Sequence, residues 1–88
     1  MMGEADVVTR LGGIVSKIIG PSRMPAAVGA NTQLVTDLWL DSVELLELLL
    51  ACESEFGVTL DESRDLEPAS LESLGSLAAV IVARQPVA

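Results

Sequence analysis

The stretch DSVELLELLLACESEFG, residues 41–57, decides the fold of this chain. Asp41 and Glu44 have the spacing of a capping box, in which two side chains satisfy N–H groups at the start of a helix. The apolar residues that follow recur at steps of three and four, and Gly57 suits the left-handed residue that ends many helices. The pattern therefore predicts a helix that starts at Asp41 and ends at about Phe56.

This predicted helix has more leucine than one buried stripe requires. One face carries the expected core positions Leu45, Leu48, Leu49, Cys52 and Phe56. A second face carries Val43, Leu46 and Leu50, with Glu44 and Glu47 close by on the polar side. Such a helix is either buried on two sides or has part of its apolar surface exposed for contact with a partner. The sequence leaves both interpretations open for Leu46 and Leu50.

Two further segments have helical periodicity. Apolar residues recur at helical steps over 6–19, where Gly20 and Pro21 predict the end of the helix, and from about Ser70 or Ser73 to Ala83. A short helical turn is also expected around 61–66. Together these elements predict an all-α fold: a small antiparallel bundle of three to four helices that forms a single domain over residues 1–88.

A long connection, residues 20–40, joins the first two predicted helices. Connections of this length in a compact domain are uncommon, and they usually have a function or pack through their own side chains. The expected anchors are the apolar residues Leu34, Val35, Leu38, Trp39 and Leu40. Trp39 is predicted to anchor the loop, with a contact to a partner as the alternative.

The net charge of −8 is concentrated in the second part of the chain. Residues 1–30 have three basic and two acidic side chains, whereas residues 31–88 have eleven acidic side chains against Arg64 and Arg84. This charge repels nucleic acids and anionic membranes and favours basic partners, although solubility alone could explain it. No signal peptide is recognised, and the apolar run 77–83 is too short to cross a bilayer. A cytoplasmic monomer is expected.

The residue inventory excludes several kinds of catalytic site. The chain has no histidine, so it has neither a Ser-His-Asp triad nor a His/Cys zinc site. A single cysteine, Cys52, cannot form an intrachain disulfide and is expected to pack in the core. The acidic run 61–65 lacks the spacing and the glycine of a calcium-binding loop. We therefore expect neither an enzyme nor a metal-binding protein.

Ser42 is the remaining candidate for chemistry. A serine at the start of a helix lies near the positive end of the helix and its unpaired N–H groups, where an anion such as a phosphate diester is stabilised. Serine is also common at helix starts without any further role. The residue type and its position alone therefore favour the plain structural interpretation.

The segment 37–48, DLWLDSVELLEL, resembles the signature of the acyl carrier and peptidyl carrier protein family, in which an Asp-Ser-Leu triplet opens the second helix. Glu47 matches the acid five residues after the serine, and Glu53–Gly57 matches the family's helix ending. Residues 73–81 resemble its last helix. The chain departs from the pattern at Trp39, where the family usually has glycine, at Val43, where leucine is usual, and in a longer segment between Phe56 and Leu74.

The resemblance implies that a phosphopantetheinyl transferase attaches 4′-phosphopantetheine from coenzyme A to Ser42. Asp41 would help to position this site, near the metal bound by the transferase. The thiol of the arm would hold an acyl or aminoacyl group as a thioester. Partner enzymes with basic patches would dock on the acidic second helix, through the apolar residues Val43, Leu46 and Leu50 and the acidic residues Glu44 and Glu47. Both acids could equally be solvated surface.

The resulting hypothesis is a discrete acyl carrier protein of a bacterial secondary-metabolite pathway, polyketide or non-ribosomal peptide. One lysine against four arginines hints at a GC-rich genome, and Met1 with the short tail after Arg84 fits a free-standing protein. A peptidyl carrier for an aminoacyl group is the first alternative. The alternative from another class is an unmodified helical interaction module, which would leave Ser42 free. An enzyme is the weakest alternative.

Overall fold

The computed structural model describes residues 3–61 and 67–85, and in these ranges the regular secondary structure is helical, with one isolated bridge besides. Its elements are α1 (Glu4–Ile19), the short 3-10 helix η1 (Pro21–Arg23), α2 (Ser42–Phe56) and α3 (Leu74–Arg84). The predicted all-α bundle is confirmed. The turn expected around 61–66 lies, apart from Asp61, outside the described residues.

Helix α1 is amphipathic, and its buried stripe follows the predicted periodicity. Val7, Leu11, Val15 and Ile19 are buried at successive turns. The helix begins two residues before the predicted Asp6 and ends at Ile19. Gly20 is its C-cap with a φ of 88°, and Pro21 follows. Glycine adopts this positive φ without the steric cost that a side chain would add, so the sequence signal for the helix end was correct.

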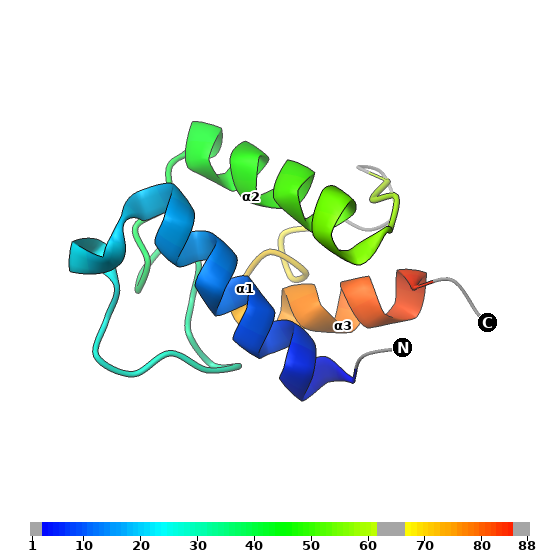
Figure 1. Ribbon diagram of the computed structural model, residues 1–88, viewed down its shortest axis with the longest axis horizontal. Coiled ribbons are helices and arrows are strands. Elements are labelled where there is room, and N and C mark those ends of the chain that lie inside the picture. Colours follow the sequence, from blue (N-terminus) through cyan, green and yellow to red (C-terminus); the bar gives the residue numbers. More distant parts are fainter. Residues whose placement is uncertain (1–2, 62–66, 86–88) are drawn as a thin grey trace.

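The three helices surround one apolar core. Helix α1 packs more extensively against α3 than against α2, and in Figure 1 it runs diagonally across the molecule, with α2 above it and α3 on its right, under α2. Leu48, Cys52 and Phe56 of α2 and the four residues Leu74, Leu77, Ala78 and Ile81 of α3 are buried with the α1 stripe. At the surface, Arg10 of α1 and Glu55 of α2 form an ion pair of 2.6 Å between Nη1 and Oε1.

Helix α3 starts as the sequence predicted, at the second of the two expected positions. Ser73 is the N-cap, and its hydroxyl accepts the N–H of Ser76. The Ser76 hydroxyl in turn accepts the N–H of Ser73, so a serine takes the place of the usual Glu or Gln in this capping box. In residues 3–61 and 67–85, no helix is both long and apolar enough to cross a membrane.

Some apolar side chains of the connection between α1 and α2 belong to the core, and others are exposed. Leu34, Leu38 and Leu40 are buried, which confirms them as anchors. Val35 and Trp39 are 59% and 73% exposed, so their predicted anchoring role is wrong. For Trp39 the reason is local backbone geometry: it has a φ of 56°, and its side chain lies outside while those of Leu38 and Leu40 lie inside.

Backbone hydrogen bonds hold this connection against the start of α3. The N–H groups of Leu74 and Gly75 donate to the carbonyl oxygens of Thr32 and Ala30, at 2.9 and 2.8 Å. At Gly75 the two segments approach so closely that an added Cβ would lie 2.8 Å from the Ala30 oxygen. Glycine is therefore required here by space and not by an unusual φ.

Alanine substitution of two helical glycines is expected to have opposite effects. Gly75→Ala should destabilise the fold by about 1–3 kcal/mol, because the backbone at Ala30 must move and its hydrogen bond weakens. Gly13→Ala, in α1 with open space around its Cβ position, should stabilise it by about 0.5–1 kcal/mol. Urea denaturation followed by circular dichroism measures both. Equal stability of the two variants would contradict the close packing at Gly75.

Candidate functional site at the start of helix α2

The capping box predicted for α2 is present. The Asp41 carboxylate accepts the N–H of Glu44 at 2.7 Å, and the Glu44 carboxylate accepts the N–H of Asp41 at 3.2 Å. Asp41 is the N-cap and Ser42 is the first helical residue, with an exposed side chain. The capping box therefore fixes the backbone on both sides of Ser42 while its hydroxyl faces solvent.

Two backbone N–H groups remain available at this helix start. The first N–H groups of a helix have no partner inside it. The capping box uses those of Asp41 and Glu44, which leaves the N–H groups of Ser42 and Val43. The Ser42 hydroxyl has no hydrogen-bond partner among the described residues. The site thus combines an accessible hydroxyl with N–H donors and the positive end of the α2 dipole.

Arg23 connects η1 to this helix start. Its guanidinium donates to both oxygens of the Glu44 carboxylate, at 2.7 Å to Oε2 and 3.3 Å to Oε1, and to the carbonyl oxygen of Trp39 at 3.1 Å. The hydrogen bond from Arg23, followed by that from the Asp41 N–H, lowers the pKa of Glu44. The hydrogen bond to Glu44 raises the pKa of Arg23. Arg23 was not predicted from the sequence as a site residue.

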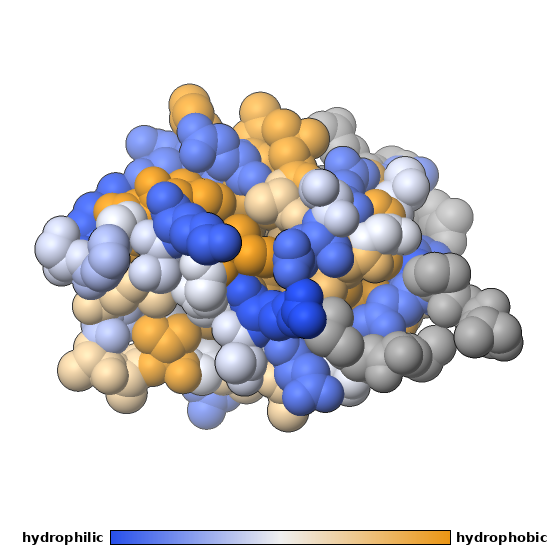
Figure 2. Space-filling view, viewed as in Figure 1, coloured by the Kyte–Doolittle hydropathy of each residue, from blue (hydrophilic) through white to orange (hydrophobic). Residues whose placement is uncertain are grey.

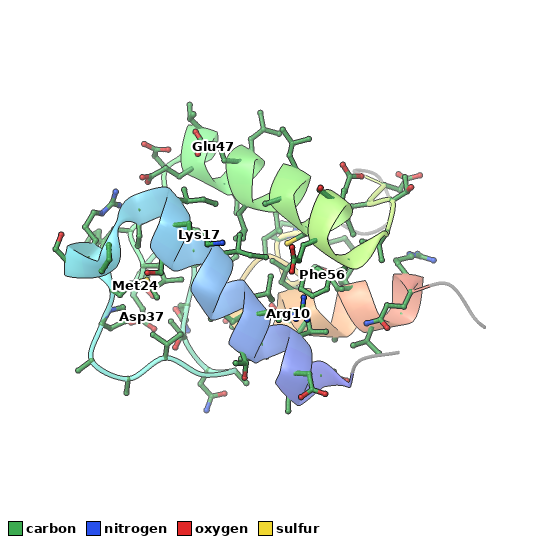
Figure 3. The ribbon with its side chains drawn as sticks, viewed as in Figure 1. Arg10, Lys17, Met24, Asp37, Glu47 and Phe56 are labelled. Atoms are coloured by element: carbon green, nitrogen blue, oxygen red, sulfur yellow. The ribbon has the colours of Figure 1, made fainter. Side chains whose placement is uncertain are left out.

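The second apolar face of α2 is exposed. Val43, Leu46 and Leu50 are 63%, 55% and 58% exposed, so the interpretation of Leu46 and Leu50 as core is wrong. Figure 2 shows apolar side chains along the upper edge of the molecule, over α2. Glu47 is exposed on the same helix (Figure 3). The Glu44 side chain is only 18% exposed, because it faces Arg23.

Residues 10–81 match the family model described as a phosphopantetheine attachment site. The chain belongs to this carrier protein family. It is also 33% identical, over 70 residues, to an acyl carrier protein of Thermotoga maritima, an alignment that covers 80% of this chain and 83% of that protein. The predicted family is thereby confirmed. Its cofactor is a covalently attached 4′-phosphopantetheine.

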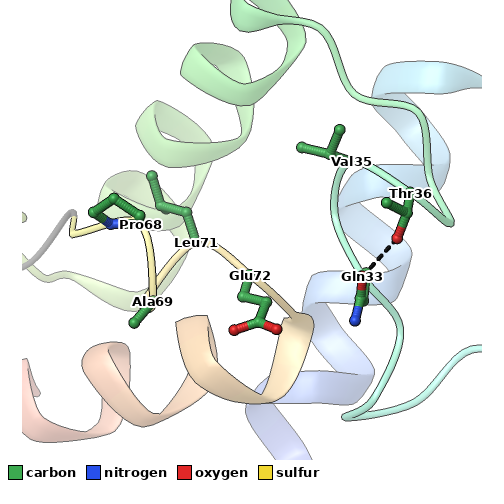
Figure 4. Close-up of a pocket in the computed structure, with 7 residues that line it drawn as sticks. All are labelled: Gln33, Val35, Thr36, Pro68, Ala69, Leu71 and Glu72. Atoms are coloured by element: carbon green, nitrogen blue, oxygen red, sulfur yellow. Dashed lines mark hydrogen bonds between the residues drawn. The ribbon is translucent and has the colours of Figure 1, made fainter.

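Carrier proteins of this family serve a phosphopantetheinyl transferase and acyl-processing enzymes and are not themselves catalytic. In residues 3–61 and 67–85, no group of three or more His, Cys, Asp or Glu residues could hold a metal ion. An open cavity of about 340 Å³ lies between the α1–α2 connection and the segment before α3 (Figure 4). Glu72 is the one ionisable residue of its lining, and Ser42 is not part of it.

Cys52 of the carrier is a core residue, as predicted. Its side chain is fully buried on the inner face of α2. Burial, with a smaller effect from the charge of Glu53, raises the pKa of its thiol to about 12. Since the thiolate is the nucleophilic and metal-binding form of cysteine, Cys52 is chemically inert at neutral pH.

Acidification is expected to remove the contribution of the Arg23–Glu44 pair to the stability of the carrier. The folded state lowers the pKa of Glu44, so this contribution is complete above the ordinary glutamate pKa of about 4.3 and is lost as the pH falls below it. The difference in Tm between wild type and Glu44→Gln should therefore be larger at neutral pH than at about pH 3. Glutamine preserves the capping box, so the variant tests the charge alone.

Glu47→Gln is the matched control for this measurement, because Glu47 is exposed on the same helix and has no ion pair among the described residues. Its Tm difference from wild type should change less with pH. A Tm difference for Glu44→Gln that stays constant across the acidic range would contradict a stabilising role of the pair.

Proposed function

We propose that this chain is an acyl carrier protein whose 4′-phosphopantetheine arm is attached to Ser42. The observation that carries the proposal is the position of Ser42: an exposed hydroxyl on the first residue of a capped helix, inside the region that matches the family. Ser22 and Ser54 are also exposed, but neither lies at the start of an α-helix or follows an acidic N-cap.

The attachment reaction needs only a nucleophilic oxygen from the carrier. The Ser42 oxygen forms a bond to the phosphorus of coenzyme A that carries pantetheine, and the bond from this phosphorus to the bridging oxygen of the pyrophosphate breaks. Adenosine 3′,5′-bisphosphate leaves with that oxygen, and the hydroxyl proton passes to a base of the transferase or to water. Because the hydroxyl is exposed and has no partner among the described residues, an enzyme can reach it without unfolding α2.

The residues at this site fit the charge of the product. A phosphate diester on Ser42 would lie near the N–H groups of Ser42 and Val43 and at the positive end of α2. The Asp41 carboxylate accepts the Glu44 N–H, which fixes the orientation of the residue directly before Ser42. We propose that it helps to place the magnesium ion bound by the transferase. When bound, the arm supplies a terminal thiol that carries cargo as a thioester.

The exposed residues of α2 support a docking role. Val43, Leu46 and Leu50, which we call the docking stripe, are each more than half exposed and repeat at helical spacing from a point next to Ser42. We propose that partner enzymes contact the docking stripe and that Glu47 and Glu44 attract their basic patches. Exposed charges of this kind mainly set association rate and salt dependence. Glu44 has less freedom for this role, because Arg23 already neutralises it.

For the cargo we propose an acyl group, and for the setting a bacterial secondary-metabolite pathway, polyketide or non-ribosomal peptide. The protein of Thermotoga maritima with 33% identity is named an acyl carrier protein, which favours acyl over aminoacyl cargo. Trp39 and Val43 stand where Gly and Leu are usual in the family pattern, so the surface beside Ser42 differs from that of a general fatty acid carrier. This difference supports a set of specialised partner enzymes.

The test is the intact mass of the chain before and after incubation with coenzyme A, magnesium and a broad-specificity phosphopantetheinyl transferase. We expect a gain of one phosphopantetheine, which peptide mapping should locate on Ser42. Folding of the sample is verified by circular dichroism. A folded chain that gains no mass would contradict the proposal and favour the unmodified helical interaction module.

A further inference from the structure

Trp39 is the only tryptophan of the chain, and its side chain is 73% exposed. Exposure leaves most of a large apolar ring in water, although tryptophan is normally well buried. The two neighbours Leu38 and Leu40 are 0% and 6% exposed. The indole ring is therefore exposed although the residues on both sides of Trp39 are buried in the core.

The backbone of Trp39 has a conformation that suits glycine. Its φ of 56° is the only positive φ of a non-glycine residue in the part of the chain that the structure describes. A bulky residue in this region is strained, and such strain often marks functional positions. Hydrogen bonds maintain the conformation: the Trp39 N–H donates to Val35 O at 3.0 Å, and the Trp39 carbonyl accepts from Arg23 at 3.1 Å. Here the chain carries a strained, exposed tryptophan where glycine would fit freely.

Exposed apolar and acidic residues lie close to Trp39 and Ser42 along the chain. Val35, whose carbonyl oxygen accepts the Trp39 N–H, is 59% exposed. Val43, on the other side of Ser42, is 63% exposed. Asp37 and Asp41 are exposed two residues before and after Trp39. The nearby cation of Arg23 is paired with Glu44. A partner surface that fits these residues would have an apolar pocket surrounded by basic side chains.

We infer that Trp39 is a docking and specificity residue for the phosphopantetheinyl transferase, whose apolar contact surface receives the indole ring beside basic groups. The inference rests on the proposed attachment at Ser42. The transferase must reach the Ser42 hydroxyl itself, whereas later enzymes need reach only the end of a long arm. A typical interface covers about 800 Å² per partner, which is about a sixth of the 5186 Å² surface of this chain. An interface centred on Ser42 therefore includes a side chain only three residues away.

Steady-state kinetics of modification test the inference. Buried aromatic anchors dominate the energy of many interfaces, so Trp39→Gly should raise the KM of the transferase for the carrier about tenfold or more, with kcat changed less than about twofold. Trp39→Phe should retain most of the affinity. Val28→Ala, at an exposed valine of the same connection but away from Ser42 in the sequence, should leave KM unchanged. Because glycine suits the backbone at residue 39, Trp39→Gly should fold, which circular dichroism verifies.

A second measurement needs no change at Trp39. In an isotope-labelled Ser42→Ala chain, the single indole N–H gives one resonance, and addition of unlabelled transferase should shift or broaden it. An unchanged indole resonance, while amides of α2 respond, would overturn the inference. So would an equal KM for wild type and Trp39→Gly when both gain phosphopantetheine. If folded wild type gains no phosphopantetheine at all, the proposed function fails, and the inference fails with it.

Discussion

Ser42→Ala is expected to abolish the gain of phosphopantetheine completely, because the substitution removes the oxygen that we propose becomes bonded to phosphorus. Its effect on folding should be small: the capping box is formed by Asp41 and Glu44, and alanine is the best helix former at an exposed helical position. Intact mass after reaction with coenzyme A and the transferase gives the answer, with the thermal midpoint as a measure of folding. A complete loss of modification with an unchanged Tm is the result we expect.

Ser54→Ala is the matched control, since Ser54 is an exposed serine of the same helix. This variant should accept one phosphopantetheine as wild type does. A Ser42→Ala chain that still gains the full mass would place the attachment elsewhere. In that case the geometry of the α2 start would have to be explained as a helix cap alone.

Leu48→Ala is expected to lower the free energy of unfolding by about 2–5 kcal/mol. Leu48 is completely buried in α2, and its truncation removes apolar contacts and leaves a cavity in the core. Because small domains are stabilised by only about 5–15 kcal/mol, the variant should lose a large part of its stability. Urea denaturation followed by helical circular dichroism measures the midpoint and the slope, and a lower midpoint with an unchanged slope would indicate a pure loss of stability.

Leu46→Ala tests the other face of the same helix with the same chemical change. Leu46 is 55% exposed, so its truncation should alter the free energy of unfolding by no more than about 0.5 kcal/mol. Equal losses for Leu46→Ala and Leu48→Ala would mean that both faces of α2 are covered in solution. That result would contradict the proposal that the docking stripe is an exposed contact surface for partner enzymes.

The helices could be predicted because each of them combines a periodic apolar stripe with a local stop or start signal. Gly20-Pro21, the Asp41/Glu44 capping box, Gly57 and Ser73 fixed the boundaries to within about two residues. These signals act over a few residues, so sequence spacing alone reveals them. The longer connection was predictable only in part. Its buried leucines follow from hydrophobicity, but hydrophobicity also predicted burial for Val35 and Trp39, which are exposed.

The exposure of Trp39 and the contact made by Arg23 could not be predicted from the sequence. The outward direction of Trp39 depends on a positive φ, which the residue type argues against and which only the surrounding hydrogen bonds enforce. The contact from Arg23 to Glu44 joins residues 21 positions apart, and nothing in the sequence selects this acid over the others. For Glu44 the sequence predicted a cap and a partner contact, and the structure adds an internal ion pair. Which side chains pair across a loop can be determined only from the folded structure.

The burial of Cys52 has a consequence for the sulfur chemistry of the modified carrier. The chain has one cysteine, whose pKa is raised to about 12 inside the core, so at neutral pH the polypeptide presents almost no thiolate. The terminal thiol of the phosphopantetheine arm is then the one reactive thiol of the molecule. A thioester on the arm has no competing thiolate within its own protein, and a thiol-alkylating reagent distinguishes the modified from the unmodified chain. Burial of the Cys52 sulfur thus prevents transfer of the cargo to the protein's own cysteine.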